Sequence, residues 1–345
     1  MSGMRRKSIW MTLMLGVLTL STAWFNAGVK AANSSGADLK ITGKILLYTS
    51  QPDQDAQGLV SAFLKKYTQA KVEIFRSGTE EVISKLLAEA KAGSVQADVL
   101  LVADAVTFER LKEQNLLMPY RSPELAKIPK AYIDKDGMYT GTKIISTALI
   151  VNTKSVTKMP NSWRVLTDRA SKGKGIMPSP LYSGAAAYTL GVLIRKDNFG
   201  WDYYKALKSN EIAITQGNGG VIKSVAAGEK SYGMVVDYMA ARAKAEGSPV
   251  ELIYPKEGVT AVTEPVGIVK GTKNAALAQA FVDFVLSADG QKLATQMGYT
   301  PLRAGIKAPQ GLKTVKGIKV IAADISELYK NRDNDKKQFS SIFEQ

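Results

Sequence analysis

Short apolar runs alternate with amphipathic segments from residue 44 onward. A strand is predicted over 44–48. It is followed by a helix with apolar residues on one face, a second strand over 71–75 and a second helix behind Ser77. The run 98–103 is apolar after its first residue, as expected for a parallel strand covered on both faces, and a helix over 106–114 comes next. This alternation predicts a doubly wound α/β sheet.

Two long β-prone runs, 143–152 and 260–269, bracket the middle of the chain. They predict a hinge of two strands that joins two α/β lobes, since the chain is too long for one ordinary core. We expect a first lobe over 40–147 plus 263–345 and a second lobe over 148–262. In the second lobe we expect strands near 176–177, 212–215, 232–236 and 250–254, with helices after Ser183 and over 221–227. Helices over 275–286 and 290–297 should return to the first lobe, and a short strand and surface helix should fill 318–343.

The start of the chain has the pattern of a secretory signal peptide. Arg5, Arg6 and Lys7 precede an apolar run over 9–25, and small residues flank Lys30 in Val29-Lys30-Ala31. An uncleaved membrane anchor is the alternative, but the run is interrupted by threonine and serine and is short for a spanning helix. We therefore expect residues 1–31 to be removed near Ala31 and the protein to be exported.

Cysteine and histidine are both absent from the sequence. Without cysteine the exported chain has neither disulfides nor a thiol for a lipid anchor, which points to the periplasm between two membranes. Without histidine, Ser-His-Asp and Cys-His catalysis are excluded and the usual general base is missing. A hydrolase using a Ser-Lys or two-carboxylate site survives, but no convincing Ser-x-x-Lys or Gly-x-Ser-x-Gly motif is present. We expect a binding protein without catalytic residues or a cofactor.

The formal charge of +15 is spread along the sequence. Its lysines fall mostly on the polar faces of predicted helices, which is typical of solvated surface. Nucleic acid is an unsuitable partner in the expected compartment. The excess of positive charge instead favours a small anionic solute, and we expect a monomer.

In a doubly wound sheet, ligands bind at the carboxyl ends of the strands, beside the N-termini of helices. The turns to consider are therefore 49–53, 76–79 and 103–105. Thr49 and Ser50 follow the first strand, and Ser77 and Thr79 follow the second in a segment that has the form of a capping box with Glu80. Each could contact ligand or simply end a strand or cap a helix; Arg76 and Asp104 are weaker candidates.

Several landmarks of the sequence occur together in a recognisable order. They are Leu47-Tyr48-Thr49-Ser50, Ser77-Gly78-Thr79-Glu80-Glu81, Gln96-Ala97-Asp98-Val99-Leu100, Tyr182-Ser183-Gly184-Ala185-Ala186, Asp237-Tyr238-Met239-Ala240, Ala288-Asp289-Gly290-Gln291 and Gly298-Tyr299-Thr300-Pro301. In these the chain resembles the type II periplasmic solute-binding proteins of ABC importers, and within them the ferric-iron and organophosphate family. The resemblance implies two lobes that close on a small solute and then dock to an inner-membrane permease.

Ferric binders of this family typically use an adjacent tyrosine pair near the second hinge strand. The matching position here reads Asp237-Tyr238-Met239, with one tyrosine, while Tyr203-Tyr204 lies in a predicted amphipathic helix and is interpreted as packing. A ferric site would have to use Tyr238, with Tyr182 as a further ligand. No metal site is otherwise expected.

The other branch binds phosphorylated sugars or phosphonates, which suits hydroxyls and free amides at helix N-termini. Ser183 would cap a helix, Gly184 would let an oxyanion approach the backbone, and Ala185 would keep the turn uncrowded; an ordinary N-cap is the alternative. From the family position, Asp237 and Tyr238 would contact the rest of the ligand. Glu264, before Pro265, could contact ligand or end a ladder. The preferred prediction is a phosphorylated or phosphonate solute, and ferric iron is the alternative.

Overall fold

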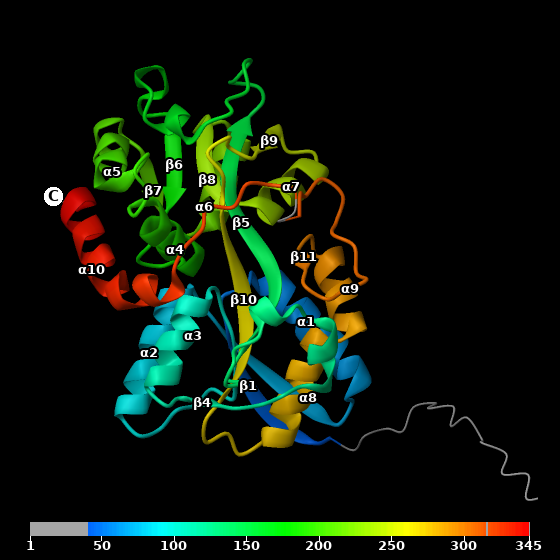
Figure 1. Ribbon diagram of the computed structural model, residues 1–345. Helices are drawn as coiled ribbons and strands as arrows, with labels where there is room; N and C mark the ends of the chain where they lie inside the picture. Colours follow the sequence, from blue (N-terminus) through cyan, green and yellow to red (C-terminus); the bar gives the residue numbers. More distant parts are fainter. Residues whose placement is uncertain (1–40, 315–316, 345) are drawn as a thin grey trace, which may run out of the picture. The chain divides into compact units, whose positions relative to one another are not determined.

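The computed structural model describes residues 41–314 and 317–344 (Figure 1). The predicted signal peptide and its cleavage near Ala31 lie outside the described residues. The α-helices are α1 (Asp53–Lys66), α2 (Thr79–Lys91), α3 (Ala105–Glu113), α4 (Gly184–Leu193), α5 (Gly200–Ser209), α6 (Asn218–Ala227), α7 (Asp237–Ala245), α8 (Ala275–Leu286), α9 (Ala288–Gln296) and α10 (Ile325–Phe343). Short 3₁₀ turns are η1 (Pro123–Lys127), η2 (Lys130–Tyr132), η3 (Trp163–Leu166) and η4 (Arg169–Ser171). None of the described helices has the length and apolar character needed to cross a bilayer.

The described strands form one 11-stranded sheet with the main order β2-β1-β3-β10-β5-β8-β6-β7. They are β1 (Gly43–Thr49), β2 (Ala70–Arg76), β3 (Val99–Leu101), β4 (Leu117–Met118), β5 (Thr140–Asn152), β6 (Gly175–Pro178), β7 (Ala213–Thr215), β8 (Tyr232–Val236), β9 (Val250–Ile253), β10 (Thr260–Val269) and β11 (Thr300–Pro301). β1 is parallel to β2 and β3, and β6 is parallel to β7 and β8. The central pair β5 and β10 is antiparallel.

The long strands β5 and β10 connect two groups of elements (Figure 1). We call the group with β1–β4, α1–α3, α8 and α9 the first lobe, and the group with β6–β9 and α4–α7 the second lobe. All 13 residues of β5 are buried, among them the apolar runs Ile144–Ile145 and Ala148–Val151 and also polar residues such as Lys143 and Ser146. The predicted α/β fold with a two-strand connection is confirmed, while the lobe boundaries 40–147 plus 263–345 and 148–262 stay a prediction.

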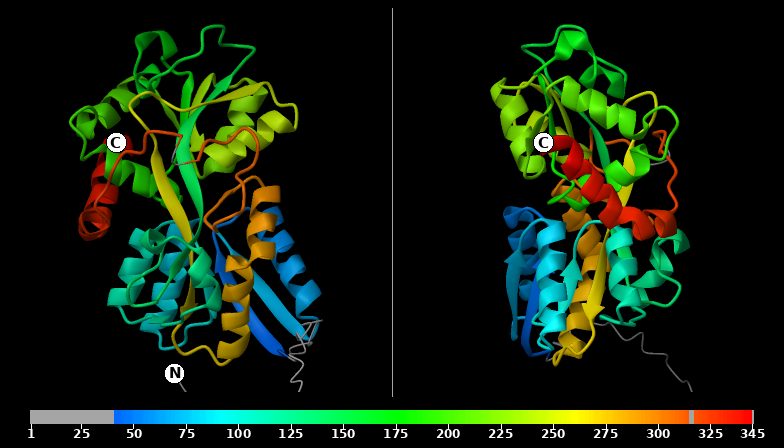
Figure 2. Two further views of the ribbon diagram at one scale, coloured as in Figure 1. Left: turned by 45° about the vertical axis from the view of Figure 1, so that its right-hand side comes forward. Right: turned by 90° about the vertical axis from the view of Figure 1, so that its left-hand side faces the viewer.

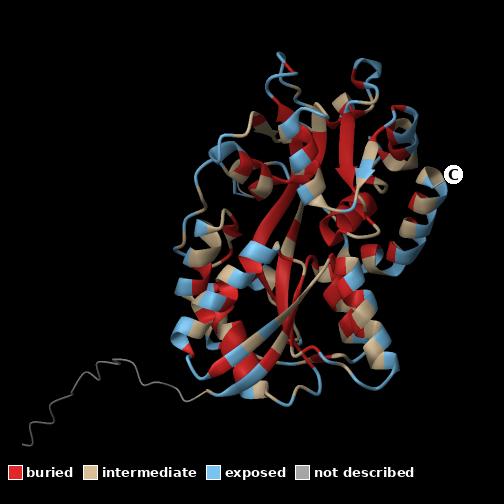
Figure 3. Ribbon diagram, turned by 180° about the vertical axis from the view of Figure 1, so that it is seen from behind, coloured by how far each residue is buried: buried red, intermediate tan, exposed pale blue. Residues whose placement is uncertain are grey.

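Each lobe has its own apolar core, and buried positions line the strands and the inner faces of the helices (Figure 3). In the first lobe, Phe63 packs edge-on against Phe281 and Phe284. In the second, Trp163 is fully buried and donates from Nε1 to the carbonyl oxygen of Gly258 at 2.8 Å. Rings of this size contribute much of the apolar area that stabilises a core.

The predicted packing role of the adjacent tyrosines is confirmed. Tyr203 and Tyr204 lie in α5 and are buried in the core of the second lobe. Burial raises the pKa of both phenols far above the usual range. Neither ring lines the cavity described below.

Three local expectations differ from the structure. Residues 237–245 form α7, where no helix was expected, because the apolar residues of this segment show only a weak helical periodicity. Val320 makes only an isolated bridge to Val259, with no strand around it. The C-terminal helix, expected on the surface, buries Leu328, Arg332, Asp335 and Phe339 because it packs against α3, α4 and α5.

Candidate functional site

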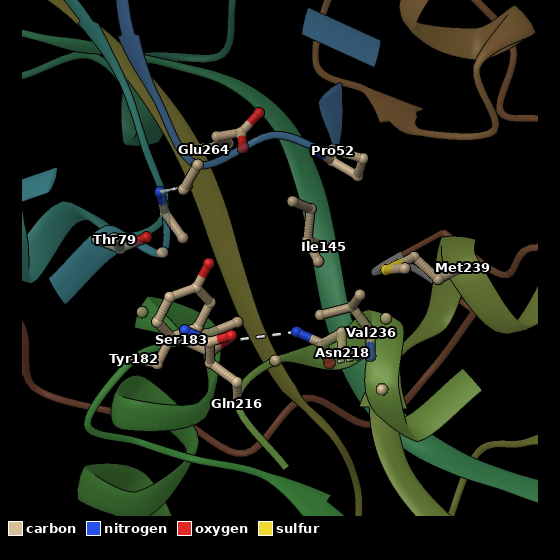
Figure 4. Close-up of a pocket in the computed structure, with 18 of the residues that line it drawn as sticks. Pro52, Thr79, Ile145, Tyr182, Ser183, Gln216, Asn218, Val236, Met239 and Glu264 are labelled. Carbon is tan, nitrogen blue, oxygen red and sulfur yellow. Dashed lines mark hydrogen bonds between the residues drawn. The ribbon is translucent and has the colours of Figure 1, made fainter. Parts of the chain in front are cut away.

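A cavity of about 420 Å³ lies where the ends of several strands meet the starts of several helices (Figure 4). This volume is in the range of small-molecule sites. Its lining comes from both lobes and from the connecting strands. The polar or small residues that line it are Ser50, Asp53, Arg76, Gly78, Thr79, Tyr182, Ser183, Gly184, Ala185, Thr215, Gln216, Gly217, Asn218, Gly219, Gly220, Tyr238 and Glu264.

The N-terminus of α4 faces this cavity. Ser183 is the N-cap residue, and its Oγ accepts a hydrogen bond from the amide of Ala186 at 3.3 Å. Gly184 and Ala185, the first residues of the helix, also line the cavity. Because the first amides of a helix have no acceptor within the helix, they remain suited to an anion.

A second helix N-terminus, that of α6, lies beside the first. Asn218 accepts from the amide of Val236 at 3.1 Å through Oδ1, and its Nδ2 donates to Ser183 Oγ at 3.4 Å (Figure 4). Gly217, the N-cap, has no side chain to occupy the amides that follow. Asn218 was not among the expected site residues, because the helix was expected to start at Val221. The signal was the run Gly217-Asn218-Gly219-Gly220, which begins two residues after the predicted strand ends at Thr215, in another strand-to-helix turn.

The first lobe forms the opposite wall and touches the second lobe directly. The Glu80 amide donates to the carbonyl oxygen of Tyr182 at 3.2 Å. A Cβ placed on Gly78 would lie 2.5 Å from that same oxygen, and one on Gly184 would lie 2.8 Å from Thr79. The two walls therefore meet at glycines because no larger residue fits.

Arg76 supplies positive charge to the cavity. Its Nε donates to the carbonyl oxygen of Gln51 at 2.8 Å, and its Nη1 lies 3.5 Å from the hydroxyl oxygen of Tyr182. These contacts orient the guanidinium beside the cavity, where it can pair with an anionic group.

Glu264 brings a carboxylate to the cavity from β10, where the pairing with β5 shifts register between Thr263 and Pro265. It forms a buried ion pair with Lys143 of β5, and Gln51 Nε2 donates to its Oε2 at 2.9 Å. Lys143 and Gln51 both contact Oε2. The pair with Lys143 also offsets the negative charge that this carboxylate would otherwise present.

The structure brings six of the nine candidate ligand residues to the cavity: Ser50, Thr79, Ser183, Gly184, Ala185 and Tyr238. Thr49 and Ser77 do not line it. Thr49 is fully buried and donates through Oγ1 to the carbonyl oxygen of Leu101 at 2.7 Å, so its hydroxyl joins neighbouring strands. Ser77 donates to Glu81. It is not the cap of α2, because Gly78 occupies that position. The expected capping box at Ser77 is therefore wrong.

Asp237 does not line the cavity either. It accepts from the amides of Ser146 and Tyr238 at 3.1 and 2.9 Å and from the Tyr254 hydroxyl at 3.3 Å. Burial raises its pKa to about 6, although these hydrogen bonds oppose the shift. Its contacts hold the start of α7 against β5.

Tyr238 lines the cavity, and its ring packs against that of Tyr299 in a tilted arrangement with centroids 4.1 Å apart. Burial raises the pKa of the Tyr238 phenol above its usual range. Tyr182 also lines the cavity. Among residues 41–314 and 317–344, no group of three or more histidine, cysteine, aspartate or glutamate side chains could hold a metal ion.

The comparisons agree with this architecture. The periplasmic binding protein AfuA of Actinobacillus pleuropneumoniae, solved with fructose-6-phosphate bound, is 25% identical with a TM-score of 0.81, over 88% of this chain and 99% of AfuA. Iron-bound HitA of Pseudomonas aeruginosa is 24% identical with a TM-score of 0.75, over 86% and 99%, which shows a shared fold. The Fe(3+)-binding periplasmic protein of Serratia marcescens is 24% identical over 282 residues, 79% of this chain and 82% of that protein.

The model of the bacterial extracellular solute-binding protein family matches residues 58–319. The predicted resemblance to type II periplasmic solute-binding proteins is thereby confirmed. The chain belongs to the family of bacterial extracellular solute-binding proteins.

Proposed function

We propose that this protein captures a small phosphorylated or phosphonate solute between its two lobes and delivers it to the inner-membrane permease of an ABC importer. The observation that carries the proposal is the pair of helix N-termini, α4 and α6, that face one cavity beside Arg76. Helix amides and an arginine together satisfy the oxygens of a phosphoryl group.

The non-phosphoryl part of the solute would lie toward Glu264. Its carboxylate lines the cavity, and Lys143 offsets its negative charge. It therefore suits a neutral hydroxyl better than it suits a second anion. Tyr238 and Ile145 would provide the surface against which the rest of the solute packs.

The periplasm is the proposed location, because relatives of the chain are named periplasmic proteins. A Sinorhizobium fredii relative named as a probable ABC transporter periplasmic-binding protein supports the permease as partner. Cleavage near Ala31, release without a lipid anchor, a monomeric state and the absence of catalytic activity remain predictions.

Titration calorimetry with fructose 6-phosphate and a simple alkylphosphonate tests the proposal. Each should bind with a dissociation constant well below millimolar, and fructose without its phosphate should bind far more weakly. Mass spectrometry of the solute released from purified protein by denaturation should find a phosphorus-containing compound. If no phosphate ester or phosphonate binds better than millimolar, the proposal fails.

Ferric iron is the second candidate, favoured by the two tyrosines, Tyr182 and Tyr238, that line the same cavity. Phenolate oxygens are hard donors that suit Fe(III), and the bound metal would have to overcome the raised pKa of Tyr238. Loading with Fe(III) should then give a visible charge-transfer band. That band should disappear in Tyr238→Phe and persist in Tyr203→Phe, whose ring is buried outside the cavity. A colourless protein with unchanged thermal melting would end this candidate.

A further inference from the structure

The C-terminal helix α10 contacts both lobes (Figure 2, right). It packs against α3 of the first lobe and against α4 and α5 of the second. A helix that contacts both lobes in this way must lose its contacts with one of them if the lobes separate. The nature of its contacts on each side indicates which one.

Its contacts with the second lobe are largely apolar. Phe339 is 2% exposed and packs edge-on against Tyr204, within the core of that lobe. Leu328 packs at Gly191 of α4, where an added Cβ would lie 2.9 Å from it. Arg195 of the loop after α4 adds a two-pronged ion pair to Asp335, at 2.7 and 3.2 Å.

On the side of the first lobe, Leu328 and Tyr329 of α10 share a small apolar cluster with Val106 of α3. A cluster of charged side chains forms the rest of this attachment. Arg332 donates from Nη1 to Asp104 at 3.0 Å and from Nη2 to Glu80 at 2.6 Å. Lys336 lies 2.5 Å from the other oxygen of Glu80. Asp104 is fully buried, and Arg332 is 8% exposed. Arg332 and Lys336 hold the pKa of Glu80 below its usual value although burial opposes this. Burial instead raises the pKa of Asp104, and the guanidinium of Arg332 opposes that shift.

The two carboxylates of this cluster are directly joined to the cavity. Thr79 and Ala103 line the cavity, and Glu80 and Asp104 are the residues that follow them. The Glu80 amide also donates to the carbonyl oxygen of Tyr182 across the lobe boundary. Any movement of the first-lobe wall away from the second lobe therefore changes the geometry around Arg332.

The two attachments differ in how easily they separate. Removing Phe339 from its core exposes apolar surface to water, which is unfavourable in proportion to its area. Separating a buried ion cluster returns each charge to water, and the regained hydration offsets part of the lost attraction. The charged side is thus the reversible one.

We propose that Arg332, with Glu80 and Asp104, is a latch that holds the lobes together and keeps a share of the ligand-free molecules closed. Helix α10 remains with the second lobe when the lobes open, although the predicted boundaries place it in the first. Arg332 does not line the cavity, so it acts through the lobe equilibrium and raises affinity for whatever solute binds. The inference rests on the proposed function in one respect, that the lobes open and close.

The test measures the distance between spin labels on cysteines introduced at Lys91 of α2 and Lys223 of α6. Both positions are exposed, and the chain has no native cysteine to interfere. Without solute, Arg332→Met should move the distance distribution to longer values and reduce the short-distance population at least tenfold. With saturating fructose 6-phosphate the short distance should return, at a dissociation constant at least tenfold higher than that of the wild type.

The matched control is Arg303→Met, which removes a partly buried arginine paired with Glu124 at 2.6 Å within the first lobe. It should lower the melting temperature and leave the ligand-free distribution unchanged. If Arg332→Met fails to fold, Arg332→Lys, which keeps the positive charge but loses the guanidinium that contacts both carboxylates, should shift the distribution in the same direction by a smaller amount. A ligand-free distribution identical to that of the wild type in a folded variant overturns the latch. This measurement uses no solute, so it stands even if no phosphorylated compound binds.

Discussion

The N-termini of α2 and α4 have similar sequences but differ in what they contact. Ser77-Gly78-Thr79 and Ser183-Gly184-Ala185 both follow strands at the carboxyl edge of the sheet. Ser183 caps α4, and the first residues of that helix line the cavity. Ser77 instead binds Glu81, and the α2 amide of Glu80 is occupied by the carbonyl oxygen of Tyr182.

The difference shows that a favourable helix start is available to a ligand only when its amides stay free. At α2, the absence of a Cβ on Gly78 lets the other lobe approach until its own carbonyl takes an amide. At α4, the neighbouring group is Asn218 of α6, which adds a donor instead of an acceptor. One N-terminus therefore joins the lobes, and the other is left for an anion.

The largest effect should come from Gly78→Ala. The backbone of Gly78, with φ −62° and ψ 153°, suits alanine, so the substitution changes only the space between the lobes. Its Cβ would lie 2.5 Å from the Tyr182 carbonyl oxygen, which cannot rotate away as a side chain would. We expect affinity for fructose 6-phosphate to fall at least 100-fold in titration calorimetry. Retained affinity would mean that the two walls need not meet when solute binds.

Ser183→Ala should have the next largest effect. Loss of the cap should lower the free energy of unfolding by about 1 kcal/mol, and loss of the hydroxyl beside the anion should weaken binding about tenfold. Ser183→Thr is the matched control, because threonine retains a capping oxygen. Calorimetry and denaturant unfolding of both variants separate the two losses. Equal affinities in Ser183→Ala and the wild type would remove α4 from the site.

Asp237→Asn tests whether this carboxylate is structural. Its folded pKa, about 6, is above its ordinary value of 3.8, so its contribution to stability is most favourable below pH 4 and declines as pH rises toward 6. The amide keeps an oxygen for the Ser146 and Tyr238 amides. We expect the variant to be more stable than the wild type by roughly 1–2 kcal/mol at pH 7.5 and by less at pH 4.5. Denaturant unfolding at both pH values measures this.

The control for that prediction is Asp202→Asn, because Asp202 is exposed and pairs only with nearby Lys205 among the described contacts. It should leave the pH dependence of stability unchanged. Solute affinity should be preserved in Asp237→Asn. A loss of affinity beyond about tenfold would place Asp237 in the binding site after all.

The smallest effect is expected for Ser77→Ala. Its hydroxyl neither caps α2 nor lines the cavity, so affinity should stay within about twofold and stability within about 0.5 kcal/mol. Titration calorimetry of Ser77→Ala and Ser183→Ala with the same solute compares the two serines directly, since both precede a glycine at a predicted helix start. A tenfold loss in Ser77→Ala would reverse the assignment of the two N-termini.

The candidate site was predictable where local sequence and local structure agree. Ser183 and Gly184 were found because an N-cap and a permissive glycine act within one turn. Asn218 was not predicted, because α6 starts at Asn218 whereas the apolar residues of this helix begin only at Val221. Asp237 was placed near ligand from a motif alone, whereas its orientation toward Ser146 depends on β5, a segment about ninety residues away.

The sequence by itself determined the α/β alternation, the two long connecting strands and some helix starts, such as those of α4 and α8, because these follow from periodicity, chain length and turn chemistry over a few residues. Only the tertiary structure decided which N-terminus is free, which serine is turned away and where Arg332 places its charge. Those outcomes depend on contacts between segments far apart in the chain, such as Gly78 with Tyr182 and Arg332 with Asp104. A local pattern can favour a helix start, but it cannot specify what will approach that start.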